Sequence, residues 1–114
     1  MPCLKIQTNA PMDALTGSKL IGAASQLLAS QLGKPERYVM VILEPVTQML
    51  FAGDDAPLAY LELKSIGLPR QLTADLSKSL CGLLHHILDI PNNRVYIEFS
   101  DAEPGMWGWN GATF

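Results

Sequence analysis

Two stretches decide the fold: Leu4-Lys5-Ile6-Gln7-Thr8 near the start of the chain and Leu61-Glu62-Leu63-Lys64-Ser65 past its middle. Each is followed by a turn that contains a proline and then by a long helical pattern. Further matches keep a constant offset of 56 residues: Leu27-Leu28 with Leu83-Leu84, Pro35 with Pro91, and Val39 with Val95. This ordered series indicates an internal duplication, with halves at about 2–57 and 58–114 that each read strand, helix, strand.

Apolar residues at helical spacing predict one helix over about 12–32 and another over about 69–88. Gly33 and Pro35 are expected to end the first helix. Pro69 suits the start of the second, and Pro91 is expected to enforce its end. Strands are expected near 2–8, 38–44, 58–65 and 94–99, with a short strand at 48–51 and a turn or short hairpin in the glycine-containing tail.

Two strand–helix–strand units joined in one sheet place both helices on the same face, because each unit is right-handed with parallel strands. We therefore predict an α+β fold: a single domain over 1–114 with a four-stranded sheet. The run Val39-Met40-Val41-Ile42-Leu43 is apolar without alternation, which is typical of a strand buried on both faces. Since two helices cover only one face, we infer a homo-oligomer; the alternative is that the tail and loops cover the second face.

Composition narrows the class of protein. A chain of 114 residues is one domain of ordinary size, and 48% apolar with 17% charged residues is enough to build a core. The net charge of -3 argues against nucleic acid as the main partner, because no basic stripe exists to neutralise phosphates. No apolar run approaches the ~20 residues of a membrane span, and the first residues lack the features of a signal peptide. A cytoplasmic protein is expected, with Cys3 and Cys81 as free thiols.

Pro2 is the first candidate for a catalytic residue. Removal of Met1 would leave a proline at the N-terminus, whose secondary amine is unlike any side chain. An ordinary α-amino group titrates near ~7.7–8.0, and burial or a nearby cation lowers that pKa. Pro2 would then be a general base at neutral pH. The alternative is plain: many proteins begin Met-Pro and use the proline for nothing.

Topology predicts which residues share an edge with Pro2. Parallel strands of one unit start at the same edge of the sheet, so Lys34 belongs beside Pro2. The end of the third strand, Ser65-Ile66-Gly67, arrives there if the two halves pack antiparallel, and its backbone N–H groups are expected to be free. A base, a cation and backbone donors suit a substrate with a carboxylate next to an acidic C–H. Without Pro2, Lys34 would be a solvated loop lysine.

The chain resembles the macrophage migration inhibitory factor homologues of the tautomerase superfamily. The resemblance runs from Pro2 to Phe114. It is carried by Pro2 with Thr8-Asn9, Gly33-Lys34-Pro35, Ser65-Ile66-Gly67, Leu80-Cys81-Gly82-Leu83-Leu84, Arg94-Val95-Tyr96-Ile97, and Gly108-Trp109-Asn110 with Thr113-Phe114. It implies a homotrimer of duplicated βαβ subunits.

The resemblance also implies an activity, the keto–enol tautomerisation of aromatic α-keto acids such as phenylpyruvate, with dopachrome analogues accepted too. It makes Pro2 the general acid and base. Lys34 and the backbone at Ser65 and Ile66 would hold the substrate's oxygens, and Tyr96 would come from the neighbouring subunit. The aromatic residues of the tail, Trp107, Trp109 and Phe114, belong with the binding site. No cofactor is implied.

Several positions depart from the family's pattern. Glu98 stands where animal members commonly have asparagine; at the site its carboxylate would repel a keto acid and raise the pKa of Pro2. Trp107 replaces a small aliphatic residue, and either narrows the site or lies on the surface. The CxxC of animal homologues is replaced by Pro57-Leu58-Ala59-Tyr60. The competing function is a non-catalytic signalling or partner-binding protein of the same fold.

Other residue types give no site. His85 and His86 are adjacent on the second predicted helix, so they point in different directions and cannot form a paired metal site there. We predict no metal site. The glycines are scattered, and no glycine-rich phosphate-binding motif occurs.

Overall fold

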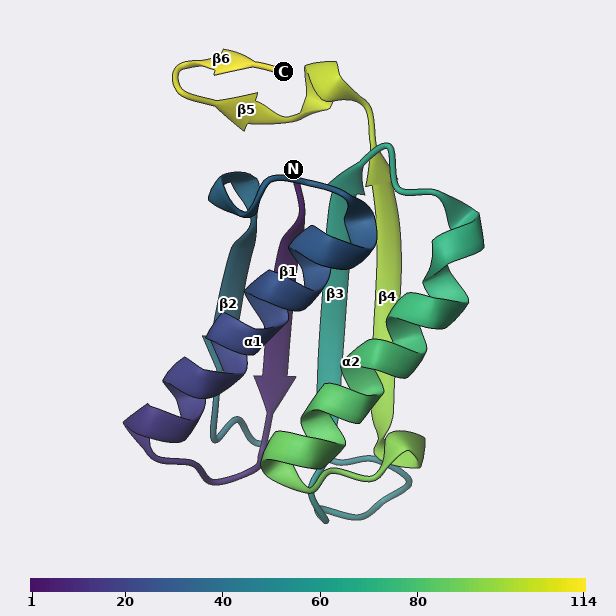
Figure 1. Ribbon diagram of the computed structural model, residues 1–114. Helices are drawn as coiled ribbons and strands as arrows, with labels where there is room; N and C mark the ends of the chain where they lie inside the picture. Colours follow the sequence, from purple (N-terminus) through teal and green to yellow (C-terminus); the bar gives the residue numbers. More distant parts are fainter.

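The computed structural model describes all residues from 1 to 114 and contains a mixed four-stranded sheet with two long helices (Figure 1). The sheet consists of β1 (Cys3–Thr8), β2 (Met40–Glu44), β3 (Ala59–Ile66) and β4 (Val95–Ala102), in the order β2-β1-β3-β4. The helices are α1 (Ala14–Leu32) and α2 (Thr73–Leu88), and a small hairpin of β5 (Gly108–Trp109) and β6 (Ala112–Thr113) ends the chain.

The pairing of the strands confirms two βαβ units. β1 pairs in parallel with β2, β3 pairs in parallel with β4, and the two units join through the antiparallel pair of β1 and β3. Both helices lie on one face of the sheet, α1 over the first unit and α2 over the second (Figure 1). The sequence predicted this arrangement because two right-handed units joined in one sheet place their helices on the same face.

The helix ends match the sequence in part. The Asp13 carboxylate caps α1 by accepting a hydrogen bond from the Thr16 N–H (2.8 Å), and Gly33 ends it at φ 63°. The second helical segment begins directly after Pro69, as predicted, but its first turn over Arg70–Leu72 is a 3₁₀ turn, and α2 itself begins at Thr73. Its end is capped by Asp89 at φ 57°, two residues before the proline that was expected to stop it.

The core lies between the sheet and the helices. One face of β1 and β3 buries its apolar side chains against the leucine stripes of α1 and α2, and each large aliphatic side chain buried there contributes about 1.5–3 kcal/mol. At most 1% of each of these residues is exposed: Leu4, Ile6, Leu61 and Leu63 from the sheet, and Leu20, Leu28, Leu76, Leu80 and Leu84 from the helices. Neither helix combines the length and apolar character that crossing a membrane requires.

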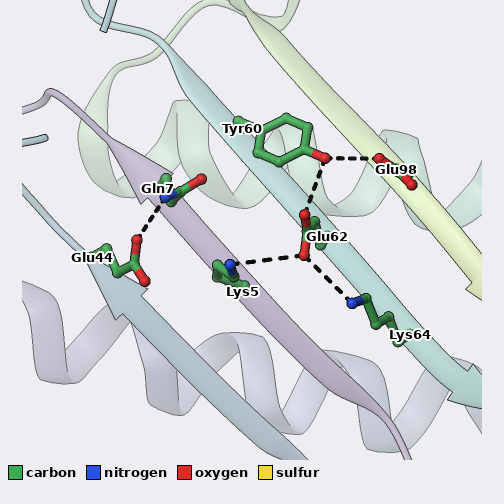
Figure 2. A network of polar contacts seen from close by, with 7 residues as sticks. All are labelled: Lys5, Gln7, Glu44, Tyr60, Glu62, Lys64 and Glu98. Carbon is green, nitrogen blue, oxygen red and sulfur yellow. Dashed lines mark hydrogen bonds and ion pairs between the residues drawn. The ribbon is translucent and has the colours of Figure 1, made fainter. Parts of the chain in front are cut away.

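The face of the sheet away from the helices is polar, and Figure 2 shows its network. Glu62 lies between Lys5 (3.9 Å) and Lys64 (3.8 Å). Tyr60 donates to Glu98, and Gln7 donates to Glu44. We call this surface the open face, defined by Lys5, Gln7, Glu44, Tyr60, Glu62, Lys64 and Glu98. Our expectation of a second apolar face is therefore wrong for most of the sheet.

The apolar strand that motivated that expectation is β2, an edge strand. Val41 and Leu43 pack against the core, whereas Met40 and Ile42 point the other way and are 60% and 39% exposed. Only this edge of the open face is apolar, so a partner would cover a strip along β2 and not a whole face.

The predicted strand at 48–51 is wrong as well. No strand lies beside this segment in the protomer, and only a bridge between Phe51 and Asp54 forms there. Arg94 fixes the loop by donating to the carbonyl oxygens of Phe51, Asp54, Ala56 and Pro57 (3.0–3.4 Å). β4, by contrast, continues to Ala102 because Ser100, Asp101 and Ala102 pair with the last three residues of β3.

Candidate active site

A cavity of about 230 Å³ lies at the end of the sheet where β1 and β2 begin. It is lined by Met1–Cys3, by residues 37–40, and by the C-terminal hairpin through residues 107–109 and Phe114. A larger hollow of about 760 Å³ lies around residues 46–50 with Asn9 and Asp55, at the other end of β1. That hollow is wide open and contains none of the residues to which the sequence analysis assigned a catalytic or substrate-binding role. The smaller cavity is therefore the candidate active site.

Pro2 is held in the wall of this cavity by the sheet. Its side chain is buried, and its carbonyl oxygen accepts a hydrogen bond from the Met40 N–H (3.0 Å). Burial lowers the pKa of the adjacent Met1 amino group from its ordinary value, and the charge of Lys34 lowers it further. The environment at this end of β1 disfavours a positive charge, which is what a basic amine at neutral pH requires.

Aromatic rings form the opposite wall. Tyr38 meets Trp109 and Phe114 edge to face, with centroid distances of 5.5 and 6.0 Å. Trp109 and Phe114 stack on each other at 5.4 Å, and the Phe114 N–H donates to the Trp107 carbonyl (3.2 Å). Each such aromatic pair is worth about 0.5–1.5 kcal/mol beyond its buried area. The cluster folds the tail over Pro2 and offers flat surfaces to an aromatic ligand.

Two cations lie at this end of the sheet. Lys34 is half-buried just after α1 and close enough to the start of the chain to act on the terminal amine, but it is not among the residues that line the cavity. Arg37, in the 3₁₀ turn Glu36–Tyr38, lines the cavity with its guanidinium 4.8 Å from the centroid of the Tyr38 ring. Neither cation has an acidic partner within 4.0 Å in the protomer.

Sequence reasoning missed Arg37, Tyr38 and Met40. The signal that could have found them was available, because residues just before β2 must share the edge at which β1 begins. The same reasoning had placed Lys34 there, and it applied equally to the next turn.

The end of β3 departs from what we expected. The pairing of Cys3 with Lys64 brings Ser65 across from the position of Pro2, but Ser65 is fully buried on the side of the helices. Ile66 is half-buried at the end of the strand. The Gly67 N–H is not free, because it donates to the Ala102 carbonyl (3.3 Å). The expected donor at Gly67 is therefore wrong.

Tyr96 and Glu98 lie away from the cavity in the protomer. Both are on β4, two strands from β1. The Tyr96 ring packs on Phe51 with a centroid distance of 4.8 Å and is 65% exposed. Glu98 accepts a hydrogen bond from the Tyr60 hydroxyl (2.8 Å), which raises the pKa of Tyr60 to about 12 (Figure 2). These two residues reach a Pro2 cavity only if it belongs to another subunit.

The cysteines carry no activated thiol. Cys3 lines the cavity, and burial raises the pKa of its thiol despite the nearby charges of Lys64 and Lys5. Cys81 is buried on α2, as the leucine-rich pattern around it indicated, and burial raises its pKa too. A neutral thiol is a poor nucleophile, so neither cysteine is a candidate for the reactive group.

Comparison with known proteins agrees with this fold and site. The family model of macrophage migration inhibitory factor matches residues 1–114. The chain is 39% identical to the macrophage migration inhibitory factor homologue of Brugia malayi and 37% identical to the factor of Xenopus tropicalis, covering 100% of this chain and 99% of each relative. A crystal structure of the homologue from Prochlorococcus marinus is 42% identical, with a TM-score of 0.92 over 98% of both chains.

The chain therefore belongs to the macrophage migration inhibitory factor family, which is part of the tautomerase superfamily. The match covers every element of the structure, from the strand that holds Pro2 to the hairpin that closes over it. The resemblance drawn from the sequence is confirmed.

Proposed function

We propose that the protein is a keto–enol tautomerase of aromatic α-keto acids such as phenylpyruvate, with Pro2 as the general acid and base. The observation that carries the proposal is the cavity itself. Pro2, whose amine would be N-terminal once Met1 is removed, lies in this cavity opposite an aromatic wall, and burial and Lys34 lower the pKa of the Met1 amine beside it. Dopachrome analogues, which combine a ring with a carboxylate, are a second group of candidate substrates.

The reaction needs one proton to move. With Met1 removed, the neutral amine of Pro2 takes a proton from the carbon next to the ketone, and the electrons of the broken C–H bond form the enolate. The resulting ammonium then returns a proton to the enolate oxygen, which yields the enol and regenerates the base. Burial and the charge of Lys34 lower the pKa of the Met1 amine at this end of β1. The same surroundings should favour the neutral form of the Pro2 amine once Met1 is removed, so that more base is present at neutral pH than for an exposed terminus.

The remaining residues have positioning roles in this proposal. Lys34 attracts the carboxylate of the keto acid, the main chain at Ile66 binds a substrate oxygen beside Ser65, and the ring stacks on Trp109 and Phe114. Trp107 narrows the entrance.

The proposal includes a homotrimer in which Tyr96 and Glu98 of one subunit approach the Pro2 cavity of the next. The exposed strip of Met40 and Ile42 along β2 supports it, because an apolar sheet edge next to the cavity is a surface that association would bury. Analytical ultracentrifugation at micromolar concentration should give the mass of three chains. A stable monomer would contradict the trimer and remove Tyr96 from the site.

An ultraviolet assay of phenylpyruvate tautomerisation tests the mechanism. Mass spectrometry should first show that the purified chain begins at Pro2. A variant with one alanine inserted before Pro2 should lose at least about a hundred-fold in kcat/KM, because an amide nitrogen is not basic. Pro91→Ala is the matched control: it alters a proline that lies outside the cavity and should keep its activity.

Unchanged turnover in the extended variant would refute Pro2 as the base. No turnover of any aromatic α-keto acid by the intact protein would favour the non-catalytic alternative, a binding protein of the same fold.

A further inference from the structure

Arg37 is the only charged side chain that lines the cavity within the protomer, and no acidic side chain of the same protomer lines it. Lys34 is a second cation close to the start of the chain, where its charge acts on the terminal amine. The neighbouring Glu36 is engaged elsewhere, since its carboxylate accepts a hydrogen bond from the Ser25 hydroxyl (2.9 Å) on α1. If Lys34 binds the carboxylate of the keto acid, Arg37 has no counter-charge in its own protomer; in the proposed trimer, Glu98 of the neighbouring subunit is the one acidic group that would compete for it.

The guanidinium of Arg37 has free hydrogen-bond donors that an anion could use. Its guanidinium donates no hydrogen bond within the protomer and makes no ion pair, and the face of the Tyr38 ring supports it at 4.8 Å. A guanidinium held flat against a ring still presents its N–H groups at its edge, where a carboxylate can accept two of them. Tyr38 also belongs to the aromatic wall on which the substrate ring would stack, so the cation lies beside that wall.

Arg94 differs from Arg37 in how its guanidinium donors are used. Arg94 also lies over an aromatic ring, that of Phe51 at 5.4 Å, but its guanidinium donates to four backbone carbonyl oxygens of one loop. Arg94 is therefore satisfied within the fold, whereas Arg37 keeps all its donors at a cavity.

We propose that Arg37 is a specificity-determining residue that binds a second carboxylate, so that the cavity prefers aromatic α-keto acids with an acidic group on the ring. The proposal rests on the proposed tautomerase function for the first carboxylate and its reaction. The volume of about 230 Å³ restricts the ligand to one ring with short substituents.

Ligand binding without reaction provides the first test. Both tryptophans of the chain, Trp107 and Trp109, line the cavity, so their fluorescence reports occupancy independently of turnover. Terephthalate should bind about three- to ten-fold more tightly than benzoate, as expected for one partly exposed guanidinium–carboxylate pair. Arg37→Gln should abolish this preference by lowering terephthalate affinity more than benzoate affinity, and Arg37→Lys should keep part of the preference.

Arg70→Gln is the matched control. It removes the same charge from the exposed 3₁₀ turn before α2, outside the cavity, and should preserve the preference. A preference that survives in Arg37→Gln would overturn the proposal, as would an equal loss of affinity for both ligands or the absence of binding by either.

Turnover separates this proposal from the function on which it rests. The kcat/KM for 4-carboxyphenylpyruvate should exceed that for phenylpyruvate by a similar factor, and Arg37→Gln should remove the advantage mainly through KM. If neither keto acid reacts while the terephthalate preference depends on Arg37, the tautomerase proposal fails and the anion site stands. If both react equally well in the wild-type protein, the assignment of Arg37 is wrong.

Discussion

Each half of the chain forms one βαβ unit, and the two units differ at the end of the sheet where their parallel strands begin. We call this region the open corner in the first half and the closed corner in the second half. The match of Leu4 with Leu61 places Ala59 at the position of Pro2, and the offset of 56 residues that holds after the first strand places Ile90 at that of Lys34 and Arg94 at that of Tyr38. In the first half the corner surrounds a cavity that Arg37 lines, with Lys34 close by. In the second half Ala59 is 2% exposed and Ile90 is fully buried.

The difference shows how a duplicated fold gains a single site. The second corner is closed by apolar side chains and by an arginine whose donors bind the loop at residues 51–57. The first corner lacks both devices and is covered instead by the C-terminal hairpin, which leaves room beneath it. The corner that stabilises the fold and the corner that holds the candidate active site are thus separate, and mutations should separate their effects.

The largest effect is expected at the closed corner. Arg94→Gln leaves up to four carbonyl oxygens without their donor and should lower the free energy of unfolding by about 2–3 kcal/mol. Arg37→Gln, at the open corner, should cost less than about 1 kcal/mol because only its contact with Tyr38 is lost. Urea denaturation of both variants measures this. Equal losses would show that the two corners do not differ in stabilising role.

Removing the positive charge of Lys34 at the open corner should change activity without changing the fold. Lys34→Met keeps the length of the side chain and removes the charge that lowers the pKa of the terminal amine. That pKa should rise, so the acidic limb of the pH profile of kcat/KM should move to higher pH. The loss of the carboxylate's partner should also reduce kcat/KM by about ten-fold at neutral pH.

Lys19→Met on α1 is a suitable control, since Lys19 is exposed and lies outside the cavity. An acidic limb that stays in place in Lys34→Met would mean that burial alone sets the basicity of the amine.

How far the sequence predicted this structure depends on whether a feature is local. The duplication, the two helices and the strand order follow from apolar periodicity and chain connectivity. The strand expected at 48–51 does not form, because a strand needs a neighbour and none lies beside this segment in the protomer. Arg37 was missed because the dipeptide Glu36-Arg37 looks like an ordinary exposed turn. Only the 3₁₀ geometry and the position of Tyr38 bring its guanidinium to the cavity.

The smallest effect is expected at Glu98, which lies on β4 in the second half of one subunit and would approach Pro2 of the next subunit in the proposed trimer. In the protomer this carboxylate belongs to the open face and accepts the hydrogen bond of Tyr60. If the trimer brings it near a neighbouring Pro2, its charge stabilises the ammonium form of the base and repels the keto acid. Glu98→Gln should then raise kcat/KM for phenylpyruvate a few-fold, up to about ten-fold, and move the acidic limb to lower pH.

A second titration makes this result interpretable. Glu98 is the main cause of the raised pKa of Tyr60, so in Glu98→Gln the Tyr60 hydroxyl should ionise at lower pH whatever the assembly. This change in absorbance shows that the substitution acts on the open face. A pH–rate profile identical to that of the wild type, together with the shifted Tyr60 titration, would confine Glu98 to the open face. If the pH–rate profile shifts as well as the Tyr60 titration, the Glu98 carboxylate lies within electrostatic reach of a Pro2. Because β4 is two strands away from β1 in one protomer, that Pro2 would belong to a neighbouring subunit.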